Sequence, residues 1–149
     1  MDILVAVDGS EESDRAIAHA ADIADATAGS VTLAHVVDPS AYDTGGSEPV
    51  DFGSEADHRL IIESLEDAET RGIDVLEDAV DVAADLGVDA ESELLYGGPV
   101  EELTDLAESG GFDAIYLGHR GRSERAGLML GSVAKSVVER ATVPVTVVR

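Results

Sequence analysis

Residues 118–133 read Gly-His-Arg-Gly-Arg-Ser-Glu-Arg-Ala-Gly-Leu-Met-Leu-Gly-Ser-Val and join an apolar run, Ala114–Leu117, to a helix-like segment, Val133–Ala141. The apolar run is typical of a short buried strand. Gly118 and Gly121 allow the backbone to approach a ligand closely or to adopt a positive φ. Gly131 and Ser132 place backbone N–H groups, a hydroxyl and the positive end of a helix dipole at one point. The stretch therefore predicts an anion-binding loop between a strand and a helix.

The distribution of charge around this loop favours a negatively charged ligand. Residues 1–119 carry thirty acidic and three basic side chains, whereas residues 120–149 carry six basic and two acidic ones. Cations gathered near a glycine-rich loop in an otherwise acidic chain indicate an anionic partner. A glycine-rich surface loop followed by a helix N-cap would give the same short motif without any ligand. The loop alone leaves both interpretations open.

Length and composition predict one domain, residues 1–149, that is long enough to bury a core. Hydrophobic residues make up 44% of the chain and aromatic residues 3%, so the core must consist mainly of Ala, Val, Leu and Ile. The absence of cysteine excludes disulfides and thiolate chemistry. The sequence shows no signal-peptide pattern and no apolar run near the roughly 20 residues that span a bilayer. We therefore expect a soluble, cytoplasmic protein.

The net charge of −23 argues against two classes of partner. Nucleic acids and anionic membranes would both be repelled by such a surface, so we expect neither as a partner. Pervasive acidity is typical of proteins from a high-salt cytoplasm, where counterions screen the repulsion between carboxylates. The chain is therefore expected to come from a halophile.

Apolar strands and amphipathic helices alternate along the chain. The predicted strands are Met1–Val7, Ser30–Val37, Val88–Tyr96, Ala114–Leu117 and Val143–Val148. The predicted helices begin at the N-cap Ser10 and run to about Ala28, and then cover Glu55–Leu86, Val100–Ser109 and Val133–Ala141, with a loop at 38–54. This alternation predicts an α/β fold, a doubly wound five-stranded parallel sheet with helices on both faces.

The expected strand order is 3-2-1-4-5, which makes the third strand an edge, in agreement with its alternation of polar and apolar residues. In that order the crossovers reverse between the first and fourth strands, and ligands bind beyond the carboxyl ends of such strands. Asp8 and Gly118 lie at those two ends. The predicted topology and the glycine loop therefore point to the same crevice.

Four segments of the chain are similar to the universal stress protein (UspA-like) family, and to its nucleotide-binding branch in particular. Gly118, Gly121, Gly131 and Ser132 match the signature G-x2-G-x9-G-[ST] at every spacing. Residues 4–10 (Leu-Val-Ala-Val-Asp-Gly-Ser), 33–37 (Leu-Ala-His-Val-Val) and 144–148 (Pro-Val-Thr-Val-Val) resemble the family as well. The resemblance covers nearly the whole chain.

The resemblance implies a site for ATP, with or without Mg²⁺, and a homodimer formed through Val143–Val148. By this resemblance, residues at the end of the first strand surround the adenosine, with Asp8 accepting from the ribose hydroxyls, and Val36 packs against adenine. The glycine loop then receives the ribose and phosphates, and Arg120 and Arg122 add positive charge. The implied nucleotide-binding residues are Ala6, Val7, Asp8, Val36, Leu117, Gly118, Arg120, Gly121, Gly131, Ser132 and Val133. The chain departs from the pattern at His119-Arg120, where histidine and arginine could exchange places around the ligand.

Some of these residues have simpler interpretations. Asp8 could be a carboxylate beside a helix N-cap, and Ser132 could itself be an N-cap. The four histidines are scattered, so no zinc site is expected. No catalytic residue is assigned, because the P-loop pattern G-x4-G-K-[ST] is absent. The sequence therefore favours a nucleotide-binding module of stress response or signalling, and the alternative is a slow ATPase or an autophosphorylating enzyme.

The acidic surface predicts that the thermal midpoint of unfolding rises with KCl concentration. The Debye length falls from about 30 Å at 0.01 M salt to about 3 Å at 1 M, so salt removes the repulsion between carboxylates. Circular dichroism at increasing KCl measures the midpoint, with sucrose at matched osmolality as the control for solute exclusion. A midpoint independent of salt would refute the prediction.

Overall fold

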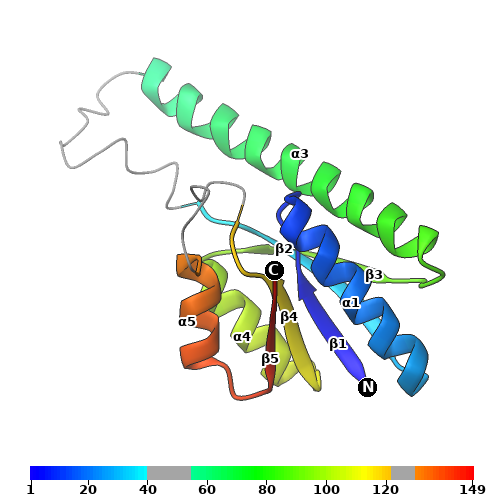
Figure 1. Ribbon diagram of the computed structural model, residues 1–149. Coiled ribbons are helices and arrows are strands. Elements are labelled where there is room, and N and C mark those ends of the chain that lie inside the picture. The colour runs from blue at the N-terminus through cyan, green and yellow to red at the C-terminus, as the bar shows by residue number, and fades with distance from the viewer. Residues whose placement is uncertain (40–54, 122–129) are drawn as a thin grey trace.

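The computed structural model describes residues 1–39, 55–121 and 130–149. The elements follow the order β1 (Asp2–Ala6), α1 (Glu11–Thr27), β2 (Ser30–Val37), α3 (Glu55–Asp85), β3 (Glu91–Tyr96), α4 (Pro99–Ser109), β4 (Ala114–Gly118), α5 (Ser132–Arg140) and β5 (Val145–Val148). All neighbouring strands are parallel, and the sheet order is β3-β2-β1-β4-β5 (Figure 1). The predicted fold class and strand order are confirmed. Most of the predicted loop 38–54 lies outside the described residues.

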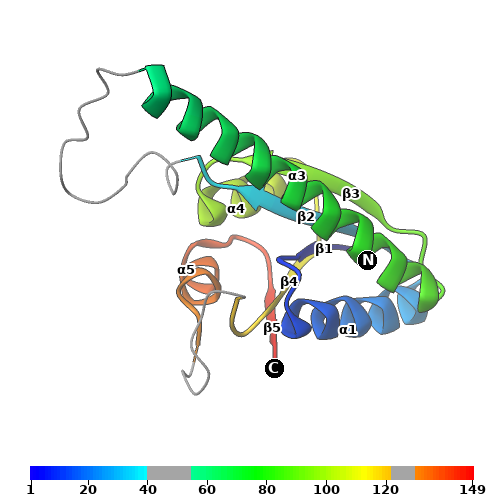
Figure 2. The same cartoon turned by 90° about the horizontal axis from the view of Figure 1, so that it is seen from above.

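Helices cover both faces of the sheet. Helices α1 and α3 pack on one face, and α4 and α5 pack on the other (Figures 1 and 2). Residues of β1 serve the two faces alternately, because Ile3 and Val5 point to α1 and α3 while Leu4 points to α4 and α5. A parallel strand covered on both sides is expected to be apolar throughout.

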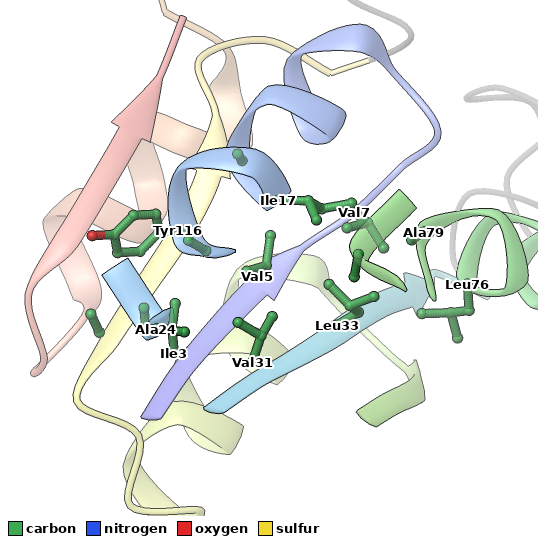
Figure 3. Packing of buried hydrophobic residues seen from close by; sticks show 14 residues of the cluster. Ile3, Val5, Val7, Ile17, Ala24, Val31, Leu33, Leu76, Ala79 and Tyr116 are labelled. Atoms are coloured by element: carbon green, nitrogen blue, oxygen red, sulfur yellow. The ribbon is translucent and has the colours of Figure 1, made fainter. Parts of the chain in front are cut away.

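Small aliphatic residues form most of the core, as the composition predicts. On the face of α1 and α3, side chains of β1 and β2 meet Ile17 and Ala24 of α1 and Leu76 and Ala79 of α3 (Figure 3). Tyr116 of β4 is the aromatic residue of this cluster. Alanine on the helices allows them to lie close to the sheet, which compensates for the scarcity of large side chains.

The third strand starts three residues later than predicted. Val88 was expected in the strand, but its amide donates to the carbonyl oxygen of Ala83 at 2.9 Å, and the amide of Gly87 donates to that of Ala84 at 2.9 Å. These two bonds, with Gly87 at φ 84°, form a Schellman cap on the end of α3. β3 is an edge strand and largely exposed, as predicted.

Two glycines at or within helices permit close approach of neighbouring parts of the chain. The left-handed residue after α1 is Ala28, at φ 53°, and a Cβ on Gly29 would collide with the carbonyl oxygen of Met1. Helix α3 continues through Gly72, where a Cβ would lie 2.9 Å from Cδ2 of His35. Within the described ranges, no helix is both long enough and apolar enough to cross a membrane.

The two-sided burial of β1 predicts a large difference between two leucine truncations. Leu4 is fully buried, whereas Leu86 at the end of α3 is 48% exposed. We expect Leu4→Ala to lower the free energy of unfolding by about 2–5 kcal/mol, and Leu86→Ala to change it by less than about 0.5 kcal/mol. Urea unfolding in high salt measures both. Similar losses in the two variants would contradict this description of the core.

Candidate functional site

A cavity of about 220 Å³ lies where β1 and β4 end. All eleven residues predicted from the sequence line it, namely Ala6, Val7, Asp8, Val36, Leu117, Gly118, Arg120, Gly121, Gly131, Ser132 and Val133. The topology explains this convergence. The chain leaves β1 through α1 on one face and leaves β4 through α5 on the other, so a crevice opens between the two connections.

Seven further residues line the cavity and were not predicted as site residues: Ser10, Ser13, Ala34, His35, Pro99, Leu103 and Ala134. Pro99 and Leu103 come from α4, whose packing against α5 is a tertiary contact without a local sequence signal. Ser10 follows Asp8 by two residues, and that spacing was a usable signal for a side-chain contact. Nδ1 of His35 lies 2.8 Å from the carbonyl oxygen of Val7, so the ring of this histidine has a hydrogen-bond partner.

The two glycine-containing ends of the loop are held together through the backbone of His119. The amide of Gly131 donates to the carbonyl oxygen of His119 at 2.6 Å. The amide of His119 donates to the carbonyl oxygen of Val148 at 2.8 Å, which fixes the same residue to the end of β5. Gly118 and Gly121 therefore stay beside Gly131 and Ser132. Residues 122–129, including Arg122, lie outside the described residues.

Helix α5 directs its N-terminus at the cavity. Its N-cap is Gly131, at φ −67° and ψ 155°, and Ser132 is the first helical residue, so the interpretation of Ser132 as the N-cap was wrong. The backbone at Gly131 is extended, and its amide bonds to the carbonyl oxygen of His119. The helix therefore starts one residue earlier than predicted. The first-turn residues 132–134 all line the cavity, and N–H groups at such positions have no partner within the helix. No acidic residue lies in this first turn, so the turn itself places no negative side chain at the positive end of the helix dipole.

Asp8 both lines the cavity and supports the start of α1. Its Oδ1 accepts hydrogen bonds from the amide of Ser10 at 3.0 Å and from the hydroxyl of Ser10 at 2.5 Å. Ser10 is the N-cap of α1, and its Oγ accepts from the amide of Ser13 at 3.1 Å. The interpretation of Asp8 as a carboxylate beside an N-cap is therefore correct, and it is compatible with a role in the cavity.

Arg120 faces the cavity, and His119 lies beneath it. The guanidinium Nε of Arg120 donates to Nε2 of His119 at 2.9 Å, and its Nη2 lies 3.8 Å from Oε1 of Glu12. His119 is buried and does not line the cavity. Because its Nε2 accepts this bond, the neutral ring carries its proton on Nδ1, an atom without a hydrogen-bond partner among the described residues. The structure therefore gives the arginine, rather than the histidine, access to a ligand.

Several carboxylates lie close together at the start of α1, near Asp8. Burial raises the pKa of Asp14, and the carboxylates of Asp8, Asp78 and Glu11 raise it further.

The wall of the cavity offers carboxylate oxygens from Asp8, backbone donors from α5, the cation of Arg120, and apolar surface from residues such as Val36 and Leu103. A molecule with hydroxyl groups, a flat apolar part and an anionic group would match all four.

A model of the universal stress protein family matches residues 1–149. Universal stress protein YxiE of Bacillus subtilis is 32% identical over 147 residues, covering 99% of this chain and 97% of that protein. Among solved structures, universal stress protein UspA from Lactobacillus plantarum superposes with a TM-score of 0.80 at 25% identity, covering 100% of this chain and 97% of that one.

Two similar structures are described as nucleotide complexes. One is a universal stress protein in complex with cAMP, with a TM-score of 0.66, 27% identity, and coverage of 100% of this chain and 96% of that one. The other is the universal stress protein from Archaeoglobus fulgidus in complex with dAMP, with a TM-score of 0.66, 27% identity, and coverage of 100% and 98%. Both ligands are adenine nucleotides.

Proposed function

Because the chain belongs to the universal stress protein family, we propose that its cavity binds an adenine nucleotide, ATP above all. We propose further that residues 1–149 act as one nucleotide-binding module in stress response or signalling. The observation that carries the proposal is the convergence of the N-terminus of α5, Arg120 and Asp8 on one cavity. Two relatives of similar fold bind adenine nucleotides, which supports the choice of base.

The chemistry of the cavity suggests how ATP would lie in it. The amides of the first turn of α5 would donate hydrogen bonds to phosphate oxygens, because helix N-termini favour anions. Arg120 would add charge at the same end of the ligand. Asp8 would accept from the ribose hydroxyls, and Val36 would pack against the adenine ring. The roles of all eleven predicted residues remain part of this proposal.

The proposal assigns any Mg²⁺ to the phosphates of the nucleotide. In the described part of the chain, no group of three or more histidine or carboxylate side chains is arranged to hold a metal ion. The alternative activity, slow ATP hydrolysis or autophosphorylation, would need a group that positions the attacking nucleophile. Ser132 follows Gly131 directly, without the lysine that separates the two residues in a P-loop, so we expect at most weak turnover.

We also propose that two copies pair through β5. This strand lies at the edge of the sheet, and its four residues are only half-buried. Exposed edge strands readily pair with a second chain, and the valines of β5 would gain burial in such a pair. The proposal extends to a cytoplasmic, high-salt setting, for which the acidic composition is the support.

The first test is to purify the protein in high salt, denature it, and identify the released small molecules by mass spectrometry. Co-purified ATP is the expected result, and it would also show that turnover is slow. ADP or AMP would favour the hydrolase alternative. An empty protein that also ignores added ATP would refute nucleotide binding.

Replacing Gly131 by valine tests the phosphate end of the site. The φ of −67° at this position suits any residue, so we expect the variant to fold and to keep its dimer. The valine side chain would obstruct the N-terminus of α5, and we expect the affinity for ATP to fall by about two orders of magnitude, equivalent to about 2.7 kcal/mol. Isothermal titration calorimetry measures the affinity, with Ser109→Val in the exposed last turn of α4 as the control. Unchanged affinity would overturn the assigned phosphate site.

A further inference from the structure

We infer that Ser10 is a positioning residue that fixes the carboxylate of Asp8, so that the site selects nucleotides with both ribose hydroxyls free. The inference rests on the proposed function and adds the class of nucleotide that the site accepts. Its basis is a hydrogen-bonded chain, from the amide of Ser13 through Oγ of Ser10 to Oδ1 of Asp8, in the wall of the cavity.

The hydroxyl of Ser10 has one proton, and the geometry commits it to Asp8. Oγ accepts from the amide of Ser13 at 3.1 Å, and it donates to Oδ1 of Asp8 at 2.5 Å. The amide of Ser10 donates to the same Oδ1 at 3.0 Å. Hydrogen bonds to an ionised acceptor are the stronger kind, and two of them on one oxygen oppose rotation of the carboxylate. Ser10 is itself buried, so water does not compete freely for these bonds.

Gly121 limits the carboxylate from the opposite side. A Cβ on this glycine would lie 2.9 Å from Oδ2 of Asp8, closer than such atoms normally approach. A freely rotating carboxylate could move away from an added methyl group, but one tied through Oδ1 cannot do so easily. The second glycine of the signature therefore makes room for Asp8 as well as for a ligand.

A carboxylate held in this way offers lone pairs in fixed directions, which suits two vicinal hydroxyl groups. A site that hydrogen-bonds a hydroxyl discriminates against an analogue that lacks it, because the complex with the analogue has one hydrogen bond fewer. The related structures with dAMP and cAMP contain ligands without a free ribose diol. Those two complexes give no sign of selection for the diol, so the selection inferred from the Ser10–Asp8 contact is a statement about this chain alone and has to be measured on it.

The experiment compares ATP, 2′-deoxy-ATP and 3′-deoxy-ATP by isothermal titration calorimetry in high salt. We expect the unmodified protein to prefer ATP over each deoxy analogue by about tenfold or more, and Ser10→Ala to reduce this preference to about twofold. Ser10→Thr retains the hydroxyl and should restore the preference. The matched control is Ser30→Ala, which removes a comparable bond, from Oγ of Ser30 to Oδ1 of Asp2 at 2.8 Å, outside the cavity.

A second variant avoids the helix cap that Ser10 provides. Gly121→Ala should displace Asp8 through Oδ2 and lower the same preference while the N-cap of α1 stays intact. If Ser10→Ala and Gly121→Ala both keep the full preference for ATP, the inference is overturned. An unmodified protein that binds ATP and both deoxy analogues equally well would also overturn it. Failure of the unmodified protein to bind any of the three would instead refute the proposed function.

Discussion

The parallel pairing of β1 with β2 on one side and with β4 on the other is the constraint on which the rest of the molecule depends. Right-handed crossovers from these strands must leave toward opposite faces of the sheet. The amide of Val7 still bonds to the carbonyl oxygen of Ala34 beyond the end of β1, so the strand holds its direction up to Asp8. That rigidity lets residues more than a hundred positions apart in the sequence form one cavity.

The sequence was sufficient to predict the elements and the strand order, because these follow from local patterns and one topological rule. The resemblance to the family named eleven of the residues that line the cavity and missed seven. Apolar runs identify buried strands, and the spacing of the glycine motif identifies the loop at Gly118. The errors lie where tertiary contacts decide. Val88 belongs to the Schellman cap of α3 and not to β3, and α5 starts at Ser132 because the amide of Gly131 bonds to His119. The residues that α4 contributes to the cavity could not be predicted either, because they depend on the packing of α4 against α5.

The two helix N-termini near the cavity differ in charge although the chain as a whole is acidic. The start of α1 carries Glu11, Glu12 and Asp14, which suit its helix dipole, whereas the start of α5 carries no acidic residue. Arg120 is held between these regions by contacts with His119 and Glu12. The wall of the cavity thus combines the cation of Arg120 and the N-terminus of α5 in a chain whose net charge is −23.

The backbone of His119 makes hydrogen bonds to two different elements. Its amide closes the pairing of β4 with β5, and its carbonyl oxygen anchors the residue from which α5 begins. A shift of α5 by even a few tenths of an ångström must therefore either stretch a 2.6 Å hydrogen bond or pull on the last rung of the sheet. The start of α5 and the edge strand β5 are therefore coupled through the backbone of His119, so a displacement of one is expected to displace the other.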